Sequence, residues 1–371
     1  MKKLLSFLLS CVFCVLSTVC VHAEERSISA AAYVLFCPDN GRVILGDNAD
    51  KQLPMASTTK IMTTLLTLEE AAVDNRVVEF TDEMVAEGSS MYLKKGEKVT
   101  LYDLAVGMMM QSGNDAANAA AISVAGSFEA FADMMNEKAA VIGMTHTHFI
   151  TPSGLDDEQH YSTAYDMALL MAYAMQNEDF AFITAQTSME VHFIYPADKF
   201  ITYPNHNKLL RMYKDCIGGK TGFTDAAGRC LVTAARRDDL TLIAVTLNDR
   251  NDWGDHTELY EEGFSRYKAM TVNSEIDSIS VVGGEADLVS LNTEDLRVVV
   301  PVEAEDVTAQ VYLPSFLYAP IEEGSVVGKV VCISNGEVLF EKPVKAAQTI
   351  GQDRKKRSLF TYIKDLLHWH S

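Results

Sequence analysis

The order of apolar and polar positions divides the chain into a mixed helix-and-strand region, from about residue 30 to 270, and a later region of short strands. Near the start, "AAYVLFC" and "GRVILGD" flank an Asn-Gly pair at Asn40 and predict a β-hairpin, because this dipeptide favours tight turns. The stretch "MASTTKIMTTLLTLEEAA" follows, with apolar residues at helical spacing. It predicts a core-facing helix that begins near Ser57.

Further helices are expected between residues 100 and 142 and again after Thr163. "VTLYDLAVGMMMQ" opens with Thr100 and Asp103 in capping-box order, and Thr163 and Asp166 repeat that spacing. "NDAANAAAISVAG" and "FEAFADMMNEKAAVIG" continue the helical pattern. The region 100–142 is therefore predicted to be a compact helical block.

After about residue 185 the pattern changes to alternating and β-branched runs, closed by a predicted helix from about Trp253 to Tyr267. These segments predict a first domain of helices packed on an antiparallel sheet that uses both chain halves. From Val272 onward, short strands recur at regular intervals with turn residues between them, which is typical of a small all-β domain. The predicted domains span residues 24–270 and 271–350.

The N-terminus has the layout of a secretory signal peptide. It carries two lysines, an apolar stretch from Leu4 to Val21, and a small-residue exit that ends at Ala23. Cleavage is expected after Ala23, so that residues 1–23 are removed and the protein is exported. A lipidated Cys11 and an uncleaved membrane anchor are the alternatives that this segment leaves open.

Residues 351–371 predict a basic amphipathic tail. Four basic residues, Arg354 to Arg357, precede a segment whose apolar side chains fall on one half of a helical wheel. A bilayer span needs about 20 apolar residues, and this segment has fewer, so it is expected to lie in a membrane interface beside anionic lipid. A disordered tail and a helix docked on the protein itself are the alternatives.

Charge and cysteine content narrow the class of protein. The formal net charge is −20 at pH 7, and removing Lys2 and Lys3 with the signal peptide makes it about −22. Such a polyanion repels nucleic acid, which excludes that partner. Four cysteines remain, and none has metal-ligand spacing. Among these, Cys216 and Cys230 are either a disulfide pair or two buried thiols.

Ser57 and Lys60 are one helical turn apart, so the lysine amine can reach the serine hydroxyl. The helix N-terminus also favours negative charge at Ser57. A serine becomes a nucleophile when a base takes its proton, and a lysine with its ordinary pKa of about 10.4 is protonated at neutral pH. Burial against the apolar helix and a second cation nearby would lower the pKa of Lys60 and make it that base.

Two further motifs accompany this pair. "QSGNDAAN" supplies Ser112 and Asn114 at a helix junction, one hydroxyl for proton relay and one amide for hydrogen bonding. "GGKTGFTDAAG" places Lys220, Thr221 and Gly222 on a predicted strand, where a lysine and a hydroxyl suit a carboxylate and glycine lets a ligand approach the backbone.

Each motif is weak evidence alone. The SxxK spacing recurs at Ser265 and Lys268, where an exposed helix end explains it, and SxN recurs at Ser290 and Asn292. Together, in the order SxxK, SxN, KTG, the motifs are far more specific.

With these motifs the chain resembles the active-site serine penicillin-recognising enzymes, whose members share the triplet. More narrowly, it is similar to low-molecular-mass penicillin-binding proteins that act as D-alanyl-D-alanine carboxypeptidases, through "MASTTKIMTTLL", "QSGNDAANAAA", "TPSGLDDEQHYSTAYDMA", "NHNKLL" and "GGKTGFTDAAGRCLV". The resemblance implies an α+β, β-lactamase/transpeptidase-like domain with helices on an antiparallel five-stranded sheet and a helical subdomain. A small all-β sandwich and a C-terminal amphipathic helix would follow.

The resemblance also implies a role for each catalytic position. Ser57 would be the acylated nucleophile and Lys60 its general base. Ser112 would relay a proton toward the departing amine, helped by Lys220.

For substrate binding, the resemblance implies that Asn114 contacts the peptide and that Lys220 and Thr221 hold the terminal carboxylate beside Gly222. The backbone N–H groups of the nucleophile and of Phe223 would form the oxyanion hole. Strict strand alternation points Lys220 and Thr221 to opposite faces, so a twist or bulge is expected to bring both to the site.

The implied protein is a serine-type D-Ala-D-Ala carboxypeptidase that needs no metal or organic cofactor. Its partners would be peptidoglycan stem peptides, β-lactams as inhibitors, and the anionic outer face of the cytoplasmic membrane, reached through the tail. A β-lactamase is disfavoured because Gly113 replaces the middle Asp of the SDN triplet and no ExxLN-type loop follows. A D,D-endopeptidase stays open as an alternative. A catalytically silent wall-binding protein is disfavoured, because a binding module would not need Ser57, Lys60, Ser112, Asn114 and Lys220 all intact.

Two local features depart from this picture. Many relatives carry an arginine before the aromatic residue that opens the last helix, whereas Asp252 precedes Trp253 here, which shifts carboxylate recognition toward Lys220 and Thr221. A histidine-rich segment near "SGLDDEQH" could also be read as a catalytic or metal set, but surface or loop-packing roles are favoured; its members are His146, His148 and His160.

Overall fold

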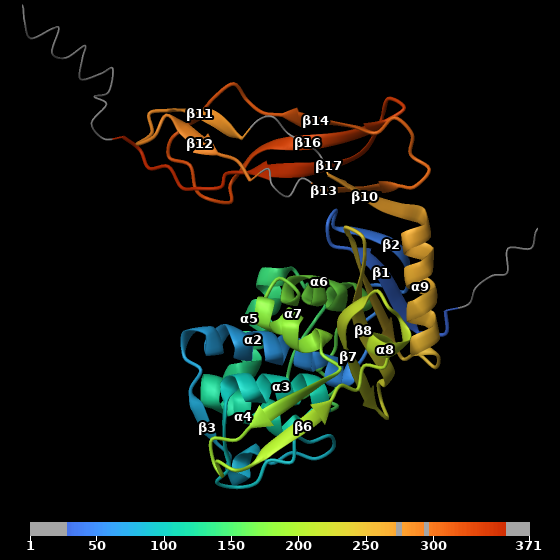
Figure 1. Ribbon diagram of the computed structural model, residues 1–371, viewed down its shortest axis with the longest axis vertical. Coiled ribbons are helices and arrows are strands. Elements are labelled where there is room, and N and C mark those ends of the chain that lie inside the picture. The colour runs from blue at the N-terminus through green and yellow to red at the C-terminus, as the bar shows by residue number, and fades with distance from the viewer. Residues whose placement is uncertain (1–27, 272–276, 293–296, 354–371) are drawn as a thin grey trace, which may run out of the picture.

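The computed structural model of the chain describes residues 28–271, 277–292 and 297–353 (Figure 1). The expected signal peptide and the basic amphipathic segment after residue 353 lie outside these residues. A five-stranded antiparallel sheet organises the first domain, in the order β2-β1-β9-β8-β7. Its strands are β1 (Ala32–Cys37), β2 (Arg42–Asp47), β7 (Cys216–Thr224), β8 (Gly228–Arg237) and β9 (Leu240–Leu247).

The sheet confirms two predictions. Strands β1 and β2 form the hairpin expected around Asn40, and the two ends of the first domain meet where β1 pairs with β9. Alternation along β1 explains why the sheet is buried on both faces. Val34 and Phe36 join one core with the helical region, while Leu35 and Cys37 join a second core under α9 (Asp252–Arg266).

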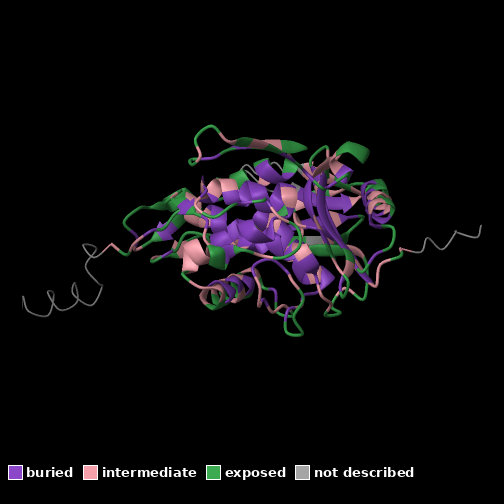
Figure 2. Cartoon of the chain, turned by 90° about the horizontal axis from the view of Figure 1, so that it is seen from below, coloured by how far each residue is buried: buried purple, intermediate pink, exposed green. Residues whose placement is uncertain are grey.

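The helical region packs on the face of the sheet opposite α9, and buried residues fill the middle of the molecule, within the helical region and along the sheet (Figure 2). Its helices are α2 (Lys60–Val73), α3 (Leu101–Gln111), α4 (Asn114–Ala125), α5 (Phe128–Ile142), α6 (Ala164–Ala174) and α7 (Glu178–Ala185). The short helix α8 (Leu209–Met212) lies on the other face of the sheet, where Leu209 joins the core under α9. Two hairpins complete the helical region: β3 (Val77–Glu79) with β4 (Lys98–Thr100), and β5 (Ser188–His192) with β6 (Phe200–Pro204). The Thr100 and Thr163 hydroxyls cap α3 and α6, as predicted.

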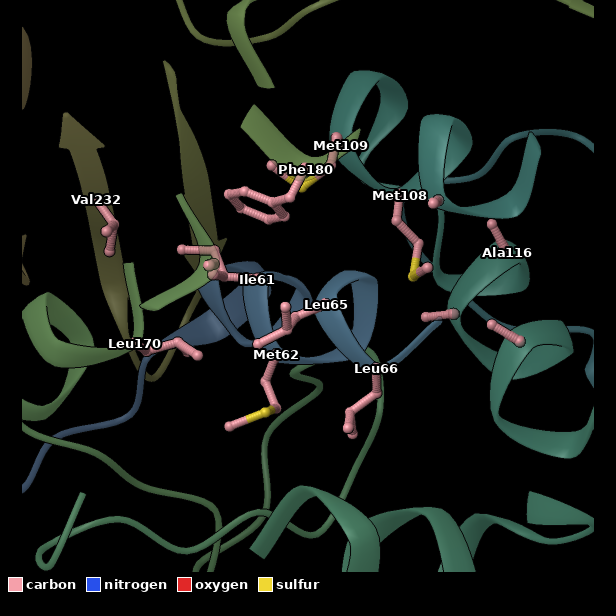
Figure 3. Packing of buried hydrophobic residues seen from close by; sticks show 14 of the residues in the cluster. Ile61, Met62, Leu65, Leu66, Met108, Met109, Ala116, Leu170, Phe180 and Val232 are labelled. Atoms are coloured by element: carbon pink, nitrogen blue, oxygen red, sulfur yellow. The ribbon is translucent and has the colours of Figure 1, made fainter. Parts of the chain in front are cut away.

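Helix α2 lies inside the helical region, and its apolar side chains point toward several neighbouring helices (Figure 3). The helix begins later than predicted. Residues Ala56–Thr59 form a tight 3-10 turn, and α2 starts at Lys60. The hydroxyls of Thr58 and Thr59 donate to the carbonyls of Met55 and Ala56, at 2.6 and 2.8 Å, which favours the tighter turn.

The β domain follows α9 and lies at one end of the molecule (Figure 1). Strand β10 (Tyr267–Thr271) pairs with β13 (Arg297–Pro301) across the predicted boundary at residue 270. The remaining strands are β11 (Ser278–Val282), β12 (Leu288–Ser290), β14 (Thr308–Tyr312), β15 (Leu317–Tyr318), β16 (Val326–Ser334) and β17 (Glu337–Lys345). They form two small sheets, β12-β11-β15 and β14-β16-β17, around a separate core.

Over the described ranges, no helix has the length and apolar character needed to cross a bilayer. The cysteines at 37, 216, 230 and 332 are free thiols, so the structure contains two thiols rather than a Cys216–Cys230 disulfide.

Candidate active site

The 3-10 turn before α2 presents Ser57 to a cleft. Ala56, the residue before it, has a φ of +48°, a left-handed conformation that costs a non-glycine residue about 1–2 kcal/mol. The surrounding structure holds this conformation in place. Gly154 packs against it so closely that an added Cβ would lie 2.0 Å from the Ala56 carbonyl oxygen.

Lys60 is completely buried directly behind Ser57. Its Nζ lies 2.9 Å from Ser57 Oγ, 2.6 Å from Asn114 Oδ1 and 2.6 Å from the Ser153 carbonyl oxygen. The Asn114 amide is oriented by its Nδ2, which donates to the Glu87 carbonyl at 2.7 Å. Two of the three partners of Nζ are therefore fixed acceptors. A neutral amine would donate both N–H groups to them and keep its lone pair for the Ser57 hydroxyl.

The electrostatics favour that neutral amine. Burial lowers the pKa of Lys60 well below its ordinary value, and the charge of Lys220 lowers it further, while Asp115 acts in the opposite direction. The sequence predicted both causes of the lowered pKa, burial and a second cation.

Ser112 and Lys220 form the second pair. Ser112 ends α3 in the left-handed conformation, with a φ of +57°, and α4 begins two residues later. Lys220 Nζ lies 3.0 Å from Ser112 Oγ and donates to the Thr221 carbonyl at 2.6 Å. Burial lowers the pKa of Lys220 to about 7. The hydroxyl of Ser112 is therefore coupled to an amine that can exchange a proton near neutral pH.

Along strand β7, successive side chains alternate between the two faces at Lys220 and Thr221, without the twist or bulge that the sequence predicted there. Thr221 and Phe223 line the cleft, whereas Lys220 is buried with its amine on Ser112. The register irregularity of β7 lies earlier, between Cys216 and Gly218. Lys220 therefore reaches the catalytic serines from the buried side of the strand.

Gly222 lets this strand approach the nucleophile turn. A Cβ at this position would lie 3.0 Å from the Met55 carbonyl oxygen and 3.1 Å from the backbone nitrogens of Ser57 and Thr58. Because those neighbours are backbone atoms, a side chain could be accommodated only by moving the turn. The contact brings the backbone on either side of Gly222, including Phe223, next to the nucleophile.

The cleft has a volume of about 320 Å³. It is lined by Ser57, Ser89, Ser112, His206, Lys208, Thr221, Gly222, Phe223, Arg229, Asp252 and Trp253. The structure thus brings the three predicted motifs together around one opening. Asn114 and Lys60 contribute from behind it. Asn114 has both ends of its amide bonded within the protein, and its expected contact with substrate stays a prediction.

Asp115 is a supporting residue that the sequence motifs did not reveal. Its carboxylate accepts hydrogen bonds from Ser90 Oγ at 2.7 Å and from the backbone N–H groups of Met91 and Leu93 at 2.8 and 3.1 Å. These bonds hold the loop that carries Ser89 at the edge of the cleft. The sequence pattern that could have revealed Asp115 is an acidic residue in the first turn of a predicted helix, here α4.

His160 is a second supporting residue, and the three histidines do not gather at one site. His160 is buried, and its Nδ1 accepts the Ile150 backbone N–H at 2.9 Å, so its proton is on Nε2. That Nε2 lies 2.8 Å from Thr59 Oγ1, the hydroxyl that donates to the Ala56 carbonyl. His146 is exposed and His148 half-buried. Within the described ranges, no three His, Cys, Asp or Glu side chains are placed to hold a metal ion.

Comparisons with known proteins agree with this geometry. A family model described as D-alanyl-D-alanine carboxypeptidase matches residues 19–251, and one described as penicillin-binding protein 5, C-terminal domain, matches residues 264–352. The chain is 32% identical to Bacillus subtilis D-alanyl-D-alanine carboxypeptidase DacF, over 92% of this chain and 90% of that protein.

Solved structures give the same result. Penicillin-binding protein 5 from Haemophilus influenzae superposes with a TM-score of 0.71 at 28% identity, covering 88% of this chain and 98% of the other. A mutant of the Streptomyces K15 DD-transpeptidase superposes with a TM-score of 0.61 at 29% identity, covering 65% of this chain and 99% of the other.

Proposed function

Because the chain belongs to the D-alanyl-D-alanine carboxypeptidase family and is a serine-type peptidase of that family, we propose that Ser57 is its nucleophile and Lys60 its general base. The observation that carries this proposal is the position of Lys60 Nζ, 2.9 Å from Ser57 Oγ, with fixed acceptors for two N–H groups. The substrate is the D-Ala-D-Ala end of a peptidoglycan stem peptide, and the product is free D-alanine.

In the acylation step, Ser57 Oγ attacks the carbonyl carbon between the two D-alanines while its proton passes to Lys60 Nζ. The tetrahedral oxygen would be stabilised by the backbone N–H groups of Ser57 and Phe223, which Gly222 brings together. Collapse breaks the C–N bond, and the departing amine takes a proton through Ser112 and Lys220, whose polar atoms lie 3.0 Å apart.

Deacylation completes the cycle. Water attacks the ester carbon as a neutral amine of the site takes its proton, and the C–O bond to Ser57 breaks as Lys60 returns a proton to Ser57 Oγ. A β-lactam resembles the acyl-D-Ala-D-Ala end and would acylate Ser57 in the same way. On the product side, removal of the last D-alanine limits cross-linking, because the stem loses its donor peptide bond.

The test is mass spectrometry of the purified protein with a penicillin and, separately, with a synthetic pentapeptide. We expect one β-lactam adduct, lost in Ser57→Ala and retained in the matched control Ser265→Ala, which alters the exposed serine with the same SxxK spacing. An adduct that survives in Ser57→Ala would refute the nucleophile. If the penicillin adduct forms but the pentapeptide releases no D-alanine, the proposed carboxypeptidase activity is refuted.

A second candidate is transfer of the acyl group to an amine, because the first domain also resembles the Streptomyces K15 DD-transpeptidase. Adding an amine acceptor to the pentapeptide assay separates the reactions. Hydrolysis gives the tetrapeptide acid, whereas transfer gives a cross-linked amide with the same release of D-alanine.

The proposed location is the outer face of the cytoplasmic membrane. Export rests on the signal-peptide layout of residues 1–23, and attachment rests on the basic amphipathic sequence after residue 353. Truncation at Gln352 is expected to abolish binding to anionic vesicles while leaving acylation by penicillin intact. Unchanged vesicle binding would reject the tail as the anchor.

A further inference from the structure

Arg229 places a guanidinium group at the cleft. On the paired strands β7 and β8, Arg229 lies directly opposite Phe223, and Thr221 lies two residues along β7 from Phe223. Opposite residues of an antiparallel pair share a face, as do residues two apart, so the Thr221 hydroxyl and the Arg229 guanidinium project from the same face. Both line the cleft that opens on Ser57.

The guanidinium is held in one orientation. Its Nη2 donates to Asp252 Oδ1 and Oδ2 at 2.6 and 2.8 Å, and its Nε donates to Oδ2 at 3.2 Å. Asp252 is itself fixed, because it is only 3% exposed and its Oδ1 accepts the Trp253 backbone N–H at 2.9 Å. The guanidinium carbon lies 5.8 Å from the centre of the Trp253 ring. The carboxylate of Asp252 and the ring of Trp253 therefore fix the plane of the Arg229 guanidinium.

One edge of this guanidinium is left for a ligand. The Arg229 side chain is 45% exposed, and among the described residues none accepts a hydrogen bond from Nη1. Arginine has five N–H donors and can bind two carboxylates along two edges. Because Asp252 is buried and Arg229 is not, an anion in the cleft meets the cation before it meets the acid.

The other basic side chains at the site are either buried, less readily charged, or not held in one orientation as Arg229 is. The amines of Lys60 and Lys220 are buried and already bonded to protein oxygens. For His206, desolvation lowers the pKa, with a further contribution from Lys220, and both effects disfavour the charged ring. Lys208 lines the cleft but is exposed on a flexible stem. Arg229 is thus the cleft cation whose geometry is set in advance.

We propose that Arg229, oriented by Asp252 and Trp253, binds the terminal α-carboxylate of the substrate together with the Thr221 hydroxyl. The inference rests on the proposed function and names the residue that makes the enzyme select peptides with a free carboxylate. It also gives a physical meaning to Asp252, which stands where many relatives are expected to carry an arginine. Here the acid opens the last helix and the arginine comes from the neighbouring strand.

The test compares an acyl-D-Ala-D-Ala peptide with its C-terminal amide, by kcat/KM for release of the last residue. Losing a charged hydrogen bond lowers binding about 10- to 100-fold, so Arg229→Gln should reduce the acid-to-amide preference by that factor, mainly through KM. Arg229→Lys should fall between, because it keeps the charge and loses the planar fork. Arg236→Gln is the matched control, an exposed arginine further along β8, and should leave the preference unchanged.

Arg229→Gln leaves the buried carboxylate of Asp252 without its cation, so the double variant Arg229→Gln/Asp252→Asn repeats the test with a neutral pair. Benzylpenicillin methyl ester, which lacks a carboxylate, reports on the Ser57 chemistry. We expect the ester to acylate the double variant within about threefold of the wild-type rate, a difference of less than 1 kcal/mol.

The outcomes separate the two proposals. A double variant that is acylated by the ester and keeps the wild-type acid-to-amide preference overturns the role of Arg229. An equal loss of kcat/KM on the acid and on the amide substrate also overturns it, because such a loss shows that Arg229 has only a structural role. Failure of the wild-type enzyme to form any Ser57 adduct would instead refute the proposed function itself.

Discussion

Two places in this chain carry a serine and a lysine three residues apart, and only one of them is built for catalysis. At Ser57 and Lys60 the spacing lies within a continuous 3-10 turn and helix, and the amine is completely buried 2.9 Å from the hydroxyl. At Ser265 and Lys268 the helix α9 ends between the two residues, and both side chains are exposed.

The partners of the second pair show what is missing. Ser265 Oγ donates to the Glu262 carbonyl at 2.8 Å, and Lys268 Nζ donates to the Val302 carbonyl at 3.3 Å, so the two side chains bond to different parts of the chain. Solvent keeps an exposed amine charged, whereas a buried amine with no acidic partner is driven toward the neutral form. The three-residue spacing allows a serine and a lysine to come into contact, and burial of the lysine amine determines whether it can act as a base.

The largest expected effect comes from removing the buried amine. Lys60→Met keeps the length and apolar stem of the side chain but removes the base, so acylation by penicillin should fall about 10²- to 10⁴-fold. Lys268→Met is the matched change at the exposed pair and should leave the rate unchanged. Stopped-flow or gel-based acylation rates measure both. A Lys60→Met rate above one tenth of wild type would mean that another group is the base.

The sequence allowed the prediction of features that depend on local spacing. Helix caps at Thr100 and Thr163, the hairpin at Asn40 and the Ser57–Lys60 pair all lie within a few residues of their partners. Local patterns of this kind are visible in a linear sequence.

Features that depend on tertiary register were missed. Arg229 is opposite Phe223 only through the pairing of β7 with β8, and it contacts Asp252 because α9 begins beside that strand. Thr59 and His160 are 101 residues apart in the chain. No periodicity connects such residues, so their contacts follow from the assembled sheet and not from any one segment.

The second largest effect tests Lys220 as a buried amine. Burial lowers its pKa from 10.5 to about 7 in the folded protein. Between those values the unfolded chain binds more protons, so the folded state gains stability as pH rises, and the penalty for the buried charge is fully present below pH 7.

Lys220→Met removes that penalty. Relative to wild type, the variant should be most stable below about pH 7, by on the order of a few kcal/mol, and should lose this advantage as pH rises toward 10.5. Urea unfolding at several pH values measures how this stability difference changes with pH. The measured difference also includes a smaller rise in the pKa of Lys60, which loses the charge of Lys220 beside it. A difference between variant and wild type that is independent of pH would contradict the buried-amine assignment.

The contact between β7 and the nucleophile turn predicts an intermediate effect. Gly222→Ala inserts a methyl group about 3.0 Å from backbone atoms of Met55, Ser57 and Thr58, which have no side-chain freedom to yield. Overpacking of this kind costs about 1–3 kcal/mol, so acylation should slow about 10- to 100-fold with the cooperative fold retained. A variant that reacts within twofold of wild type would show that the turn tolerates displacement.

The smallest effect concerns the residues that hold the turn itself. Thr59 Oγ1 donates to the Ala56 carbonyl and accepts from His160 Nε2, so one hydroxyl connects a buried histidine to the left-handed residue before Ser57. Thr59→Val keeps the shape and removes both bonds. The loss should slow acylation about tenfold, because Ala56 is no longer held in its unfavourable conformation.

Two further variants distinguish positioning from general destabilisation. Thr67→Val removes another buried hydroxyl of α2, one that donates to the Thr63 carbonyl at 2.7 Å, about three turns from the nucleophile. It should lower the unfolding free energy by about 1 kcal/mol, as Thr59→Val does, without slowing acylation. Thr59→Ser restores the hydroxyl and should recover most of the rate. If Thr67→Val slows acylation as much as Thr59→Val, the effect of Thr59 is on stability alone, and the turn before Ser57 needs no support from His160.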